Sequence, residues 1–420
     1  MELYKLSWKN IWRNKTRSGV ILGAIALGLF AGTYLSAFMT GWMVGTVRDE
    51  INTNISHIQI HDTAFAANND INACFLRQDI ETTLSKVSPE YAVAATYRLN
   101  INGMLSSANN AVGVQANGVD PDDETAVSTV WQTIPDSLGA FLPDDVKMPI
   151  VISQKIADKL KIRLRSKIVF SFQDAVGEMQ TISFRVCGIF RTANTAFDES
   201  NVFVRYDDIL AVTALPEGAV HVAAIRLADS QTDSQQASLP LEKIEAVATQ
   251  IKTLFPDYDV KSWRELNPVI AMSLDWTDIM ATVILAIFLL ALAFGIINTM
   301  LMAVLERTRE LGMLRAIGMS RRKVFTMIML ETVFLTLTGS VAGVILATAI
   351  LIPSIHSGID LSPLMGDVFE DYGFSSLVYP AINIGMFVEI LLLVIAAGIL
   401  SAIYPARKAL KLNILESIRK

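Results

Sequence analysis

Residues 276–305 read WTDIMATVILAIFLLALAFGIINTMLMAVL, a run of 30 residues that holds a single charged side chain. A helix rises about 1.5 Å per residue, so roughly 20 apolar residues cross a hydrocarbon layer about 30 Å thick. Three further stretches meet this requirement, at residues 18–43, 326–352 and 381–404. The sequence therefore predicts a membrane protein with four transmembrane helices.

The composition indicates a soluble part as well. The mean hydropathy is +0.42 and 52% of the residues are hydrophobic, yet 18% are charged and nearly all of these lie outside the four spans. Residues 44–275 form a long polar segment between the first two spans, which is enough chain to bury a core of its own.

The distribution of positive charge predicts the topology. Residues 1–17, 306–325 and 405–420 each carry a net charge of +4, whereas residues 353–380 hold four acidic residues and no lysine or arginine. By the positive-inside rule both termini and the middle loop are cytoplasmic, and residues 44–275 lie on the other side. That large segment has 19 basic and 30 acidic residues, which disfavours nucleic-acid binding.

Residues 1–17 are predicted to form an amphipathic helix lying on the cytoplasmic membrane surface. Its large apolar residues recur at i, i+4, i+7 and i+8, while lysine and arginine line another face. The apolar set is Tyr4, Trp8, Ile11 and Trp12, and the basic set is Lys5, Lys9 and Arg13. The alternative is a simple positively charged anchor.

Two helices are predicted to extend beyond the membrane. Pro268 favours a helix start, and no further proline follows before Glu306, so one helix of 39 residues would be about 58 Å long. Residues 19 to about 52 also lack proline. Because these segments enter and leave the large polar domain, they would form a paired stalk, with residues 268–275 at its outer end. The alternative is that both helices break at the membrane surface.

Small residues spaced four apart let membrane helices approach closely. Three such pairs are candidates for helix packing: Gly19 and Gly23, Gly28 and Gly32, and Gly339 and Gly343. Two acidic residues, Glu331 and Glu389, fall inside spans three and four. Their insertion cost of about 2.5–3.5 kcal/mol each can be offset by neighbouring leucines. We expect them to face protein in helix packing, with an ion pathway as the alternative.

The large polar domain is predicted to be α+β, with two subdomains. Strand–helix–strand patterns occur at residues 57–61, 77–87 and 91–95, and again at residues 220–227, 241–255 and 258–263. They would form a split β-α-β layer from residues 44–119 and 215–267. Residues 120–214 would form an inserted β-rich subdomain, with a helix at 153–160 and strands at 167–172, 180–190 and 201–204.

Catalytic motifs are missing from the sequence. It holds no phosphate-binding G-x-x-x-x-G-K-[ST], no G-x-S-x-G and no H-E-x-x-H, so we expect no enzymatic activity and no metal or cofactor in this chain. His57 and His61 share a strand face without a nearby third ligand, which disfavours a metal site. Cys74 and Cys187 fall in different predicted subdomains, and whether they pair stays open.

The middle loop carries the most specific local pattern. Residues 306–318, ERTRELGMLRAIG, place Leu311, Leu314 and Ile317 at i, i+3 and i+6 among charges of both signs, and Gly318 can end the helix. Such a short amphipathic helix could insert into a groove on a cytoplasmic partner. The alternative is a solvated linker.

The chain resembles FtsX-like permeases of MacB-type ABC transporters. The resemblance rests on LSWKNIWRNKTRS before the first span, ERTRELGMLRAIGMSRRKVF in the loop and YPARKALKLNILESIR at the end. The segments SQKIADKLKIRLRSKIVFSF and FRVCGIFRTANTAFDESNVFV are similar to the family's extracytoplasmic domain. The resemblance implies a permease in the inner membrane that works as a dimer, with a second copy or a paralogue, and with an ATPase dimer that binds ATP.

Residue roles follow from the same resemblance. The family's ATPase-coupling helix corresponds to Glu306, Arg307, Glu310, Gly312, Leu314, Arg315, Ala316 and Gly318, and its surface helix to Trp8, Lys9, Trp12, Arg13 and Asn14. MacB itself carries a fused ATPase ahead of its first span, whereas here only a short segment precedes it. The ATPase is therefore expected from a separate chain.

The resemblance also implies a cargo. The stretches HIQIHDTAF and SWRELNP are similar to the lipoprotein-releasing LolC/LolE branch, which implies release of lipoproteins from the inner membrane, driven by movement of the periplasmic domain and passed to a periplasmic carrier. MacB-like efflux of peptides or hydrophobic compounds through a periplasmic adaptor is the first alternative. An FtsX-like regulator of a cell-wall hydrolase, which transports nothing, is the second.

Overall fold

The computed structural model of the chain describes residues 2–84, 91–108, 110–229, 241–365, 377–381 and 384–410. The chain divides into two compact units. We call residues 1–45, 273–360 and 377–420 the helical bundle, and residues 46–272 with 361–376 the β-rich domain.

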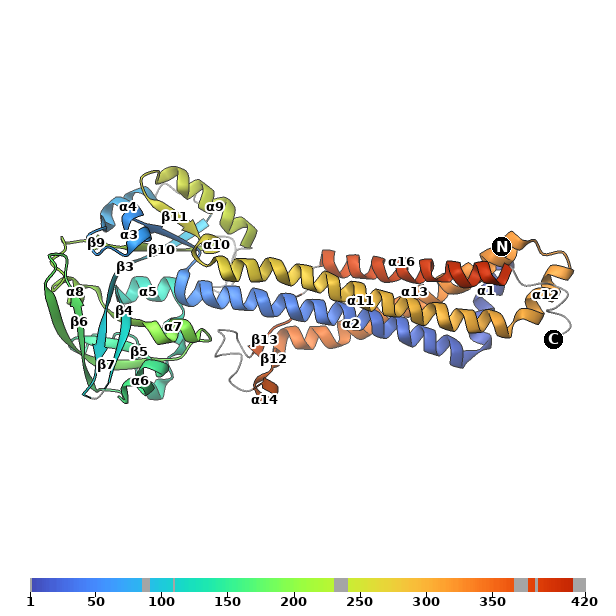
Figure 1. Cartoon of the computed structure of the whole chain (residues 1–420), viewed down its shortest axis with the longest axis horizontal. Helices are drawn as coiled ribbons and strands as arrows, with labels where there is room; N and C mark the ends of the chain where they lie inside the picture. Colours follow the sequence, from blue (N-terminus) through green and yellow to red (C-terminus); the bar gives the residue numbers. More distant parts are fainter. Residues whose placement is uncertain are drawn as a thin grey trace. The chain divides into compact units, whose positions relative to one another are not determined.

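In its described residues, the helical bundle holds most or all of four long helices, together with two short ones (Figure 1). The long helices are α2 (Lys15–Glu50), α11 (Pro268–Glu306), α13 (Arg321–Ser357) and α16 (Ile384–Leu410). All four are long and apolar enough to cross a membrane, which confirms the four predicted helices, although residues 382–383 of the fourth lie outside the described part. The short helices α1 (Glu2–Arg13) and α12 (Thr308–Ala316) lie at one end of the bundle, and the strands β12 (Ile359–Asp360) and β13 (Leu377–Val378) pair near the other.

Glycines let α13 approach α2 closely. A Cβ atom at Gly339 would lie 2.9 Å from Ile25 Cβ, and one at Gly343 would lie 3.0 Å from Leu29 Cβ. Ile25 and Leu29 are fully buried at this contact. The missing glycine side chains thus provide the space that these two apolar residues fill.

The other candidate glycines behave differently from one another. A Cβ atom at Gly28 would lie 3.5 Å from Leu292 of α11, and one at Gly32 would lie 3.2 Å from Leu285, whereas Gly19 and Gly23 have no neighbouring atom within 4 Å of that position. The sequence did not point to Gly41, which faces the backbone of residues 379–381 directly. The Ala381 N–H donates to the Ala37 carbonyl there, at 2.9 Å, which holds the segment after β13 against α2.

The two acidic residues of the spans have different surroundings. Glu331 is buried and bonds to neighbouring helices, as expected for a protein-facing residue. Glu389 is exposed on the bundle, so it does not face protein within this chain. It is the sixth residue of α16, close enough to the helix start for a flexible carboxylate to reach the polar boundary of the membrane.

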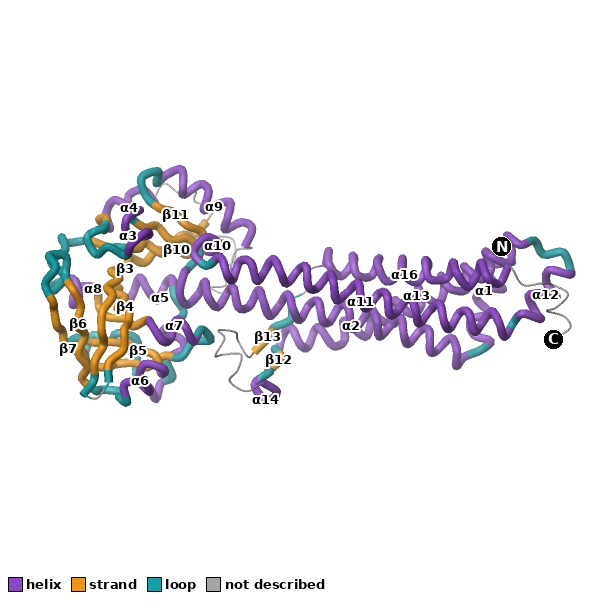
Figure 2. The backbone as a smooth tube through the Cα atoms, in the orientation of Figure 1, coloured by secondary structure: helices purple, strands orange, loops and turns teal. Residues whose placement is uncertain are grey.

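The β-rich domain is organised around one long strand, β3 (Tyr91–Ser106), which belongs to two layers (Figure 2). Its first half pairs with β10 (Val222–Asp229), and its second half pairs with β4 (Ala111–Val119) on one side and β6 (Lys167–Gln173) on the other. The remaining pairings run from β4 through β8 (Asn201–Arg205), β5 (Pro149–Ser153) and β7 (Met179–Phe190) to β6. Six strands therefore close into a barrel.

The barrel has an apolar interior that explains its closure. Alternate residues of β6 are buried, namely Ile168, Phe170 and Phe172, because strand side chains alternate between two faces. Helix α6 (Gln154–Leu160) packs against this core and is capped by Ser153, whose hydroxyl accepts from the Ile156 N–H. Closure also removes free strand edges, which would otherwise invite pairing with other chains.

The second layer is an open antiparallel sheet with strand order β11, β1, β10, β3. Strands β1 (Ile58–His61) and β11 (Asp259–Ser262) and helix α9 (Leu241–Leu254) lie within the ranges predicted for them. Helix α4 (Arg77–Leu84) matches the first part of its predicted range, and residues 85–90 lie outside the described part. Because the barrel includes β4 and half of β3, the division of this domain into two subdomains remains a proposal.

Short elements complete the domain. These are the π-helix Ile51–Ile55, α3 (Thr63–Asn68), β2 (Phe75–Leu76), α5 (Pro121–Val127), the 3-10 turns Val130–Thr133 and Asp136–Leu138, α7 (Thr195–Ser200), α8 (Tyr206–Leu210), β9 (Ala219–Val220), α10 (Trp263–Leu266) and α14 (Ser362–Met365).

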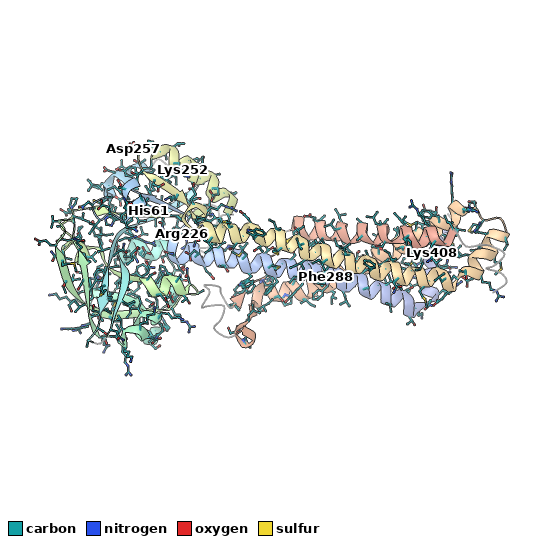
Figure 3. The ribbon with its side chains drawn as sticks, in the orientation of Figure 1. His61, Arg226, Lys252, Asp257, Phe288 and Lys408 are labelled. Atoms are coloured by element: carbon teal, nitrogen blue, oxygen red, sulfur yellow. The ribbon has the colours of Figure 1, made fainter. Side chains whose placement is uncertain are left out.

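The buried histidines of the open sheet have structural roles. His57 Nδ1 accepts from the Leu227 N–H at 2.8 Å, and His61 Nε2 lies 2.9 Å from Gln59 Oε1. His61 and Arg226 both lie in this part of the domain (Figure 3). Burial lowers the pKa of both histidines to about 4, and nearby Arg226 adds to the effect at His57.

Gly339→Ala should destabilise the helical bundle, because its new methyl group would press on Ile25. We expect a loss of about 1–3 kcal/mol relative to Gly23→Ala, measured by thermal unfolding in detergent. Gly23→Ala is the matched control, since it makes the same change in helix propensity in open space. Equal unfolding temperatures for the two variants would contradict the close approach of α2 and α13.

Acidification should destabilise the open sheet. A histidine whose folded pKa is about 4 and whose unfolded pKa is near 6.5 contributes stability above pH 6.5 that is lost as the pH falls toward 4. Hydrogen exchange of β1 and β10 should therefore speed up between pH 7 and pH 5, after correction for the intrinsic exchange rate. His57→Asn, which keeps an acceptor but cannot titrate, should show a smaller pH dependence; an unchanged dependence would contradict this explanation.

Candidate functional site

Helix α12 presents apolar side chains to solvent at one end of the bundle. Its inner side is formed by Leu311 and Gly312, which are buried, while Met313 and Ile317 are 54% and 79% exposed. The helix ends at Ala316, and Gly318, two residues later, has a φ of +104°, a conformation that glycine adopts without strain. The structure thus has the predicted helix and its predicted end, but Ile317 faces outward rather than joining Leu311 in the core.

The residues assigned to the coupling helix differ in their surroundings. Arg307 and Glu310 point to neighbouring helices and form ion pairs. Leu314 and Arg315 are half-buried, and Ala316 and Gly318 are exposed beside Ile317. Glu306 is the last residue of α11 and lines a pocket next to Arg307.

A polar network joins three helices at this end. The Arg13 guanidinium of α1 donates to both carboxylate oxygens of Glu310, at 2.6 and 2.5 Å. Arg307 also donates to Glu310, at 3.1 Å, and reaches the Glu331 carboxylate of α13 at 3.3 Å. Asn10 of α1 donates to Glu331 at 2.7 Å. We call these five residues the coupling network.

The two carboxylates of the coupling network differ in their exposure to solvent. The Arg13–Glu310 pair is about half exposed, so its own contribution to stability is about 1 kcal/mol or less. The Arg13 hydrogen bond, and after it the contact with Arg307, lowers the pKa of Glu310. Glu331 is buried, and a buried carboxylate that loses its cation is strongly destabilised.

Helix α1 packs against the bundle through a face that only partly overlaps the predicted apolar face. Ser7 and Ile11 are buried, and the Ser7 hydroxyl donates to the Met327 carbonyl at 3.3 Å. Trp8 touches Phe334 edge-on, with ring centroids 5.6 Å apart, and is partly exposed, as are Tyr4 and Trp12. Because Ser7 and Asn10 contact the bundle, the two tryptophans lie at its exposed edge. An amphipathic ring in such a place suits a membrane surface.

A pocket of about 580 Å³ lies beside the coupling network. Its polar wall includes Asn10, Arg13 and Asn14, the residue at which α1 gives way to α2. Lys9, assigned to the same surface helix, is exposed. The structure therefore brings together Arg13 and Asn14 of the predicted surface helix with Glu306 and Arg307 of the predicted coupling helix.

A second buried carboxylate, which the sequence analysis did not identify, lies at the other end of α2. Glu50 accepts from Asn54 at 3.0 Å, from Asn194 at 2.5 Å and from Asn267 at 3.3 Å. Asn54 lies one turn further along the chain, Asn194 caps α7, and Asn267 immediately precedes α11. One side chain therefore fixes the end of α2, the start of α11 and the β-rich domain together. Its only sequence signal is the i, i+4 pairing of Glu50 with Asn54.

Both cysteines carry free thiols. Cys187 is buried in the barrel, where its Sγ donates to the Ile150 carbonyl at 3.3 Å, and burial raises its pKa to about 11. Cys74 is half-buried. Neither thiol is positioned as a reactive nucleophile, because a raised pKa disfavours the thiolate.

Glu50→Ala should loosen the junction of α2 with the β-rich domain, because it leaves three asparagine amides without their acceptor. We expect a loss of about 1–3 kcal/mol and faster hydrogen exchange at residues 46–56, 192–198 and 263–270. Glu199→Ala, which removes a half-exposed carboxylate paired with Lys159, is the control and should change little. Equal effects from the two variants would contradict the role of Glu50.

Comparisons with known proteins place the chain among membrane permeases. The MacB-like periplasmic core domain matches residues 18–244, and the FtsX-like permease C-terminal family matches residues 282–414. An uncharacterized ABC transporter permease of Methanocaldococcus jannaschii is 26% identical over 67% of this chain and 64% of its own length. The ABC transporter permease YtrF of Bacillus subtilis is 26% identical over 66% and 61%. The match therefore spans less than two thirds of these relatives.

Among solved structures, the periplasmic region of MacB from Actinobacillus actinomycetemcomitans is 13% identical, covers 54% of this chain and 98% of its own, and has a TM-score of 0.35. The two family matches together cover the first, third and fourth apolar helices, residues 282–306 of the second, and residues 46–244 of the β-rich domain. The chain belongs to the ABC transporter permeases of the MacB/FtsX type, which join a MacB-like periplasmic core domain to an FtsX-like permease domain.

Proposed function

We propose that this chain couples ATP hydrolysis by a separate ATPase to movement of its own periplasmic domain. The observation that carries the proposal is the coupling network, in which α12 is ionically joined to α1 and α13. A displacement of α12 would have to move these helices or break Arg13–Glu310 and Arg307–Glu331.

The surface for the ATPase would be the outer face of α12. Met313 and Ile317 are one helical turn apart, and Ala316 and Gly318 leave the space around them open. A short helix with exposed apolar residues and flanking charges is suited to insert into a groove of a partner. On this proposal the ATPase lies on the cytoplasmic side, together with both termini, and the β-rich domain is periplasmic. The chain would act as a non-catalytic subunit in a dimer with a copy or a paralogue.

Transmission would use α2 and α11, each of which contains residues of both units. Glu50 is the last residue of α2, and its carboxylate accepts from Asn267, which immediately precedes α11. Two helices joined in this way would act on the β-rich domain as a pair rather than one at a time.

For the cargo we favour an acylated protein released from the inner membrane. The two stretches that resemble lipoprotein-releasing permeases are far apart in sequence but adjacent in the structure. Strand β1 pairs with β11, with His61 opposite Asp259, and the Trp263 N–H donates to the His57 carbonyl at 3.0 Å. The resemblance thus refers to one local region of the β-rich domain.

The second candidate is efflux with a periplasmic adaptor, and the match to the MacB-like core domain supports it equally. Reconstitution of the permease with its ATPase separates the two cargoes. Release of a triacylated lipoprotein from proteoliposomes to a soluble carrier would support the first. ATP-dependent movement of a hydrophobic compound or peptide, with no lipoprotein release, would support the second.

Ile317→Asp should abolish recovery of the ATPase with the permease purified from native membranes, since it puts a charge in the centre of the proposed contact. The residue is 79% exposed, so the fold should not change. Val176→Asp, at a turn of the β-rich domain that is 71% exposed, is the matched control and should retain the ATPase. Recovery of equal amounts of ATPase with both variants would contradict the proposed docking surface.

A further inference from the structure

A pocket of about 620 Å³ lies within the β-rich domain, away from the coupling network and from Glu50. Its walls come from segments distant in sequence: Arg77 at the start of α4, Tyr97 of β3, the first turn of α5, residues 141–144, and the junction of β8 with α8. The proposed coupling function assigns no role to this pocket.

The two arginines in the pocket already have their own counterions. Arg77 pairs with Glu81 at 2.7 Å and with Asp123 at 2.9 Å. Arg205 pairs with Asp144 at 2.7 Å and also donates to the Leu142 carbonyl. Each guanidinium therefore has a carboxylate partner, although the buried Nε–H of Arg205 has no acceptor among the described residues.

Three carboxylates that line the pocket have no counterion among the described residues. One of them, Asp120, accepts from the Asp122 and Asp123 N–H groups as the N-cap of α5, and the other two have no partner. Asp122 in α5 and Asp207 in α8 are exposed, and neither carboxylate forms a hydrogen bond or an ion pair with a described residue. They come from different walls of the pocket. With Arg77 and Arg205 neutralised, these two aspartates give the pocket a net negative charge.

The pocket also has an aromatic side. Tyr97 is only 5% exposed, and its ring lies under the Arg77 guanidinium, 4.8 Å from centroid to Cζ. Its hydroxyl forms no hydrogen bond with a described residue, and the oxygen itself is not fully buried. Phe141 and Tyr206 add half-buried rings to the lining.

A metal ion does not fit this arrangement, because no group of three or more candidate ligands that could hold a metal occurs among the described side chains. An organic cation does fit. An ammonium or guanidinium group can pair with the free carboxylates, its apolar body can cover the rings, and the Tyr97 hydroxyl can bond to it.

We propose that this pocket binds an amine- or guanidinium-bearing ligand that has an apolar or aromatic body. Such a group could belong to a free amine or to a basic residue of a peptide. Both sources use the same chemistry, and the volume of the pocket admits either.

Calorimetric titration of the full-length protein in phosphatidylcholine nanodiscs tests the proposal. The probes are acetyl-Lys-Trp-Lys-amide, spermidine and, as the acidic counterpart, acetyl-Glu-Trp-Glu-amide. We expect saturable binding of at least one cationic probe and none of the acidic peptide. Tighter binding of the peptide than of spermidine would identify a peptide source, and the reverse would identify a free amine.

Asp122→Asn/Asp207→Asn should weaken binding of the cation about tenfold, because the charge-assisted contacts are lost. Asp136→Asn/Glu178→Gln is the matched control, since it removes the same charge from two exposed positions outside the pocket and should leave binding unchanged. Tyr97→Phe should weaken binding with little effect on the fold. Absence of saturable binding, equal binding of the acidic peptide, or equal affinities of the two double variants would overturn the proposal.

Discussion

The β-rich domain depends on a buried ion pair at the point where its two layers meet. Arg98 and Glu124 are both almost fully buried, and the guanidinium donates to both carboxylate oxygens, at 3.0 and 2.7 Å. Arg98 Nη1 donates to the Asn54 carbonyl at 2.8 Å. The Thr96 hydroxyl also donates to the Glu124 carboxylate. Arg98 is the last residue of β3 before the strand passes from the open sheet into the barrel. One planar guanidinium therefore fixes β3, α5 and the π-helix that follows α2.

This ion pair and the Glu50 cluster constrain the same short segment from two directions. Glu50 ends α2 and holds Asn194 and Asn267, while Arg98 holds the carbonyl of Asn54 four residues later. Removing one partner of a buried pair costs about 3–5 kcal/mol, because the other charge stays buried. Residues 50–54 are thus held to the rest of the β-rich domain by two separate sets of polar contacts.

The sequence could predict the features that depend on local composition. Four apolar runs specify four helices, and the absence of proline between Pro268 and Glu306 predicts a helix with the bounds that the structure has. It could not predict barrel closure, because the pairing of Gly103 with Phe172 joins residues 69 positions apart and depends on register. It missed Glu50 because Asn194 and Asn267 lie 144 and 217 residues away. For α1, the periodicity of the sequence identified an amphipathic helix. Hydropathy could not show that Asn10 faces the bundle, because this orientation goes with its hydrogen bond to Glu331.

The buried carboxylates of Glu331 in the helical bundle and Glu50 in the β-rich domain have a common physical consequence. In a low-dielectric setting a charged group is costly unless its partners stay in place, so Glu331 favours the arrangement that keeps Arg307 and Asn10 close. The same holds for Glu50 and its three amides. Apolar helix contacts tolerate small sliding movements, whereas these polar contacts are lost within about 1 Å.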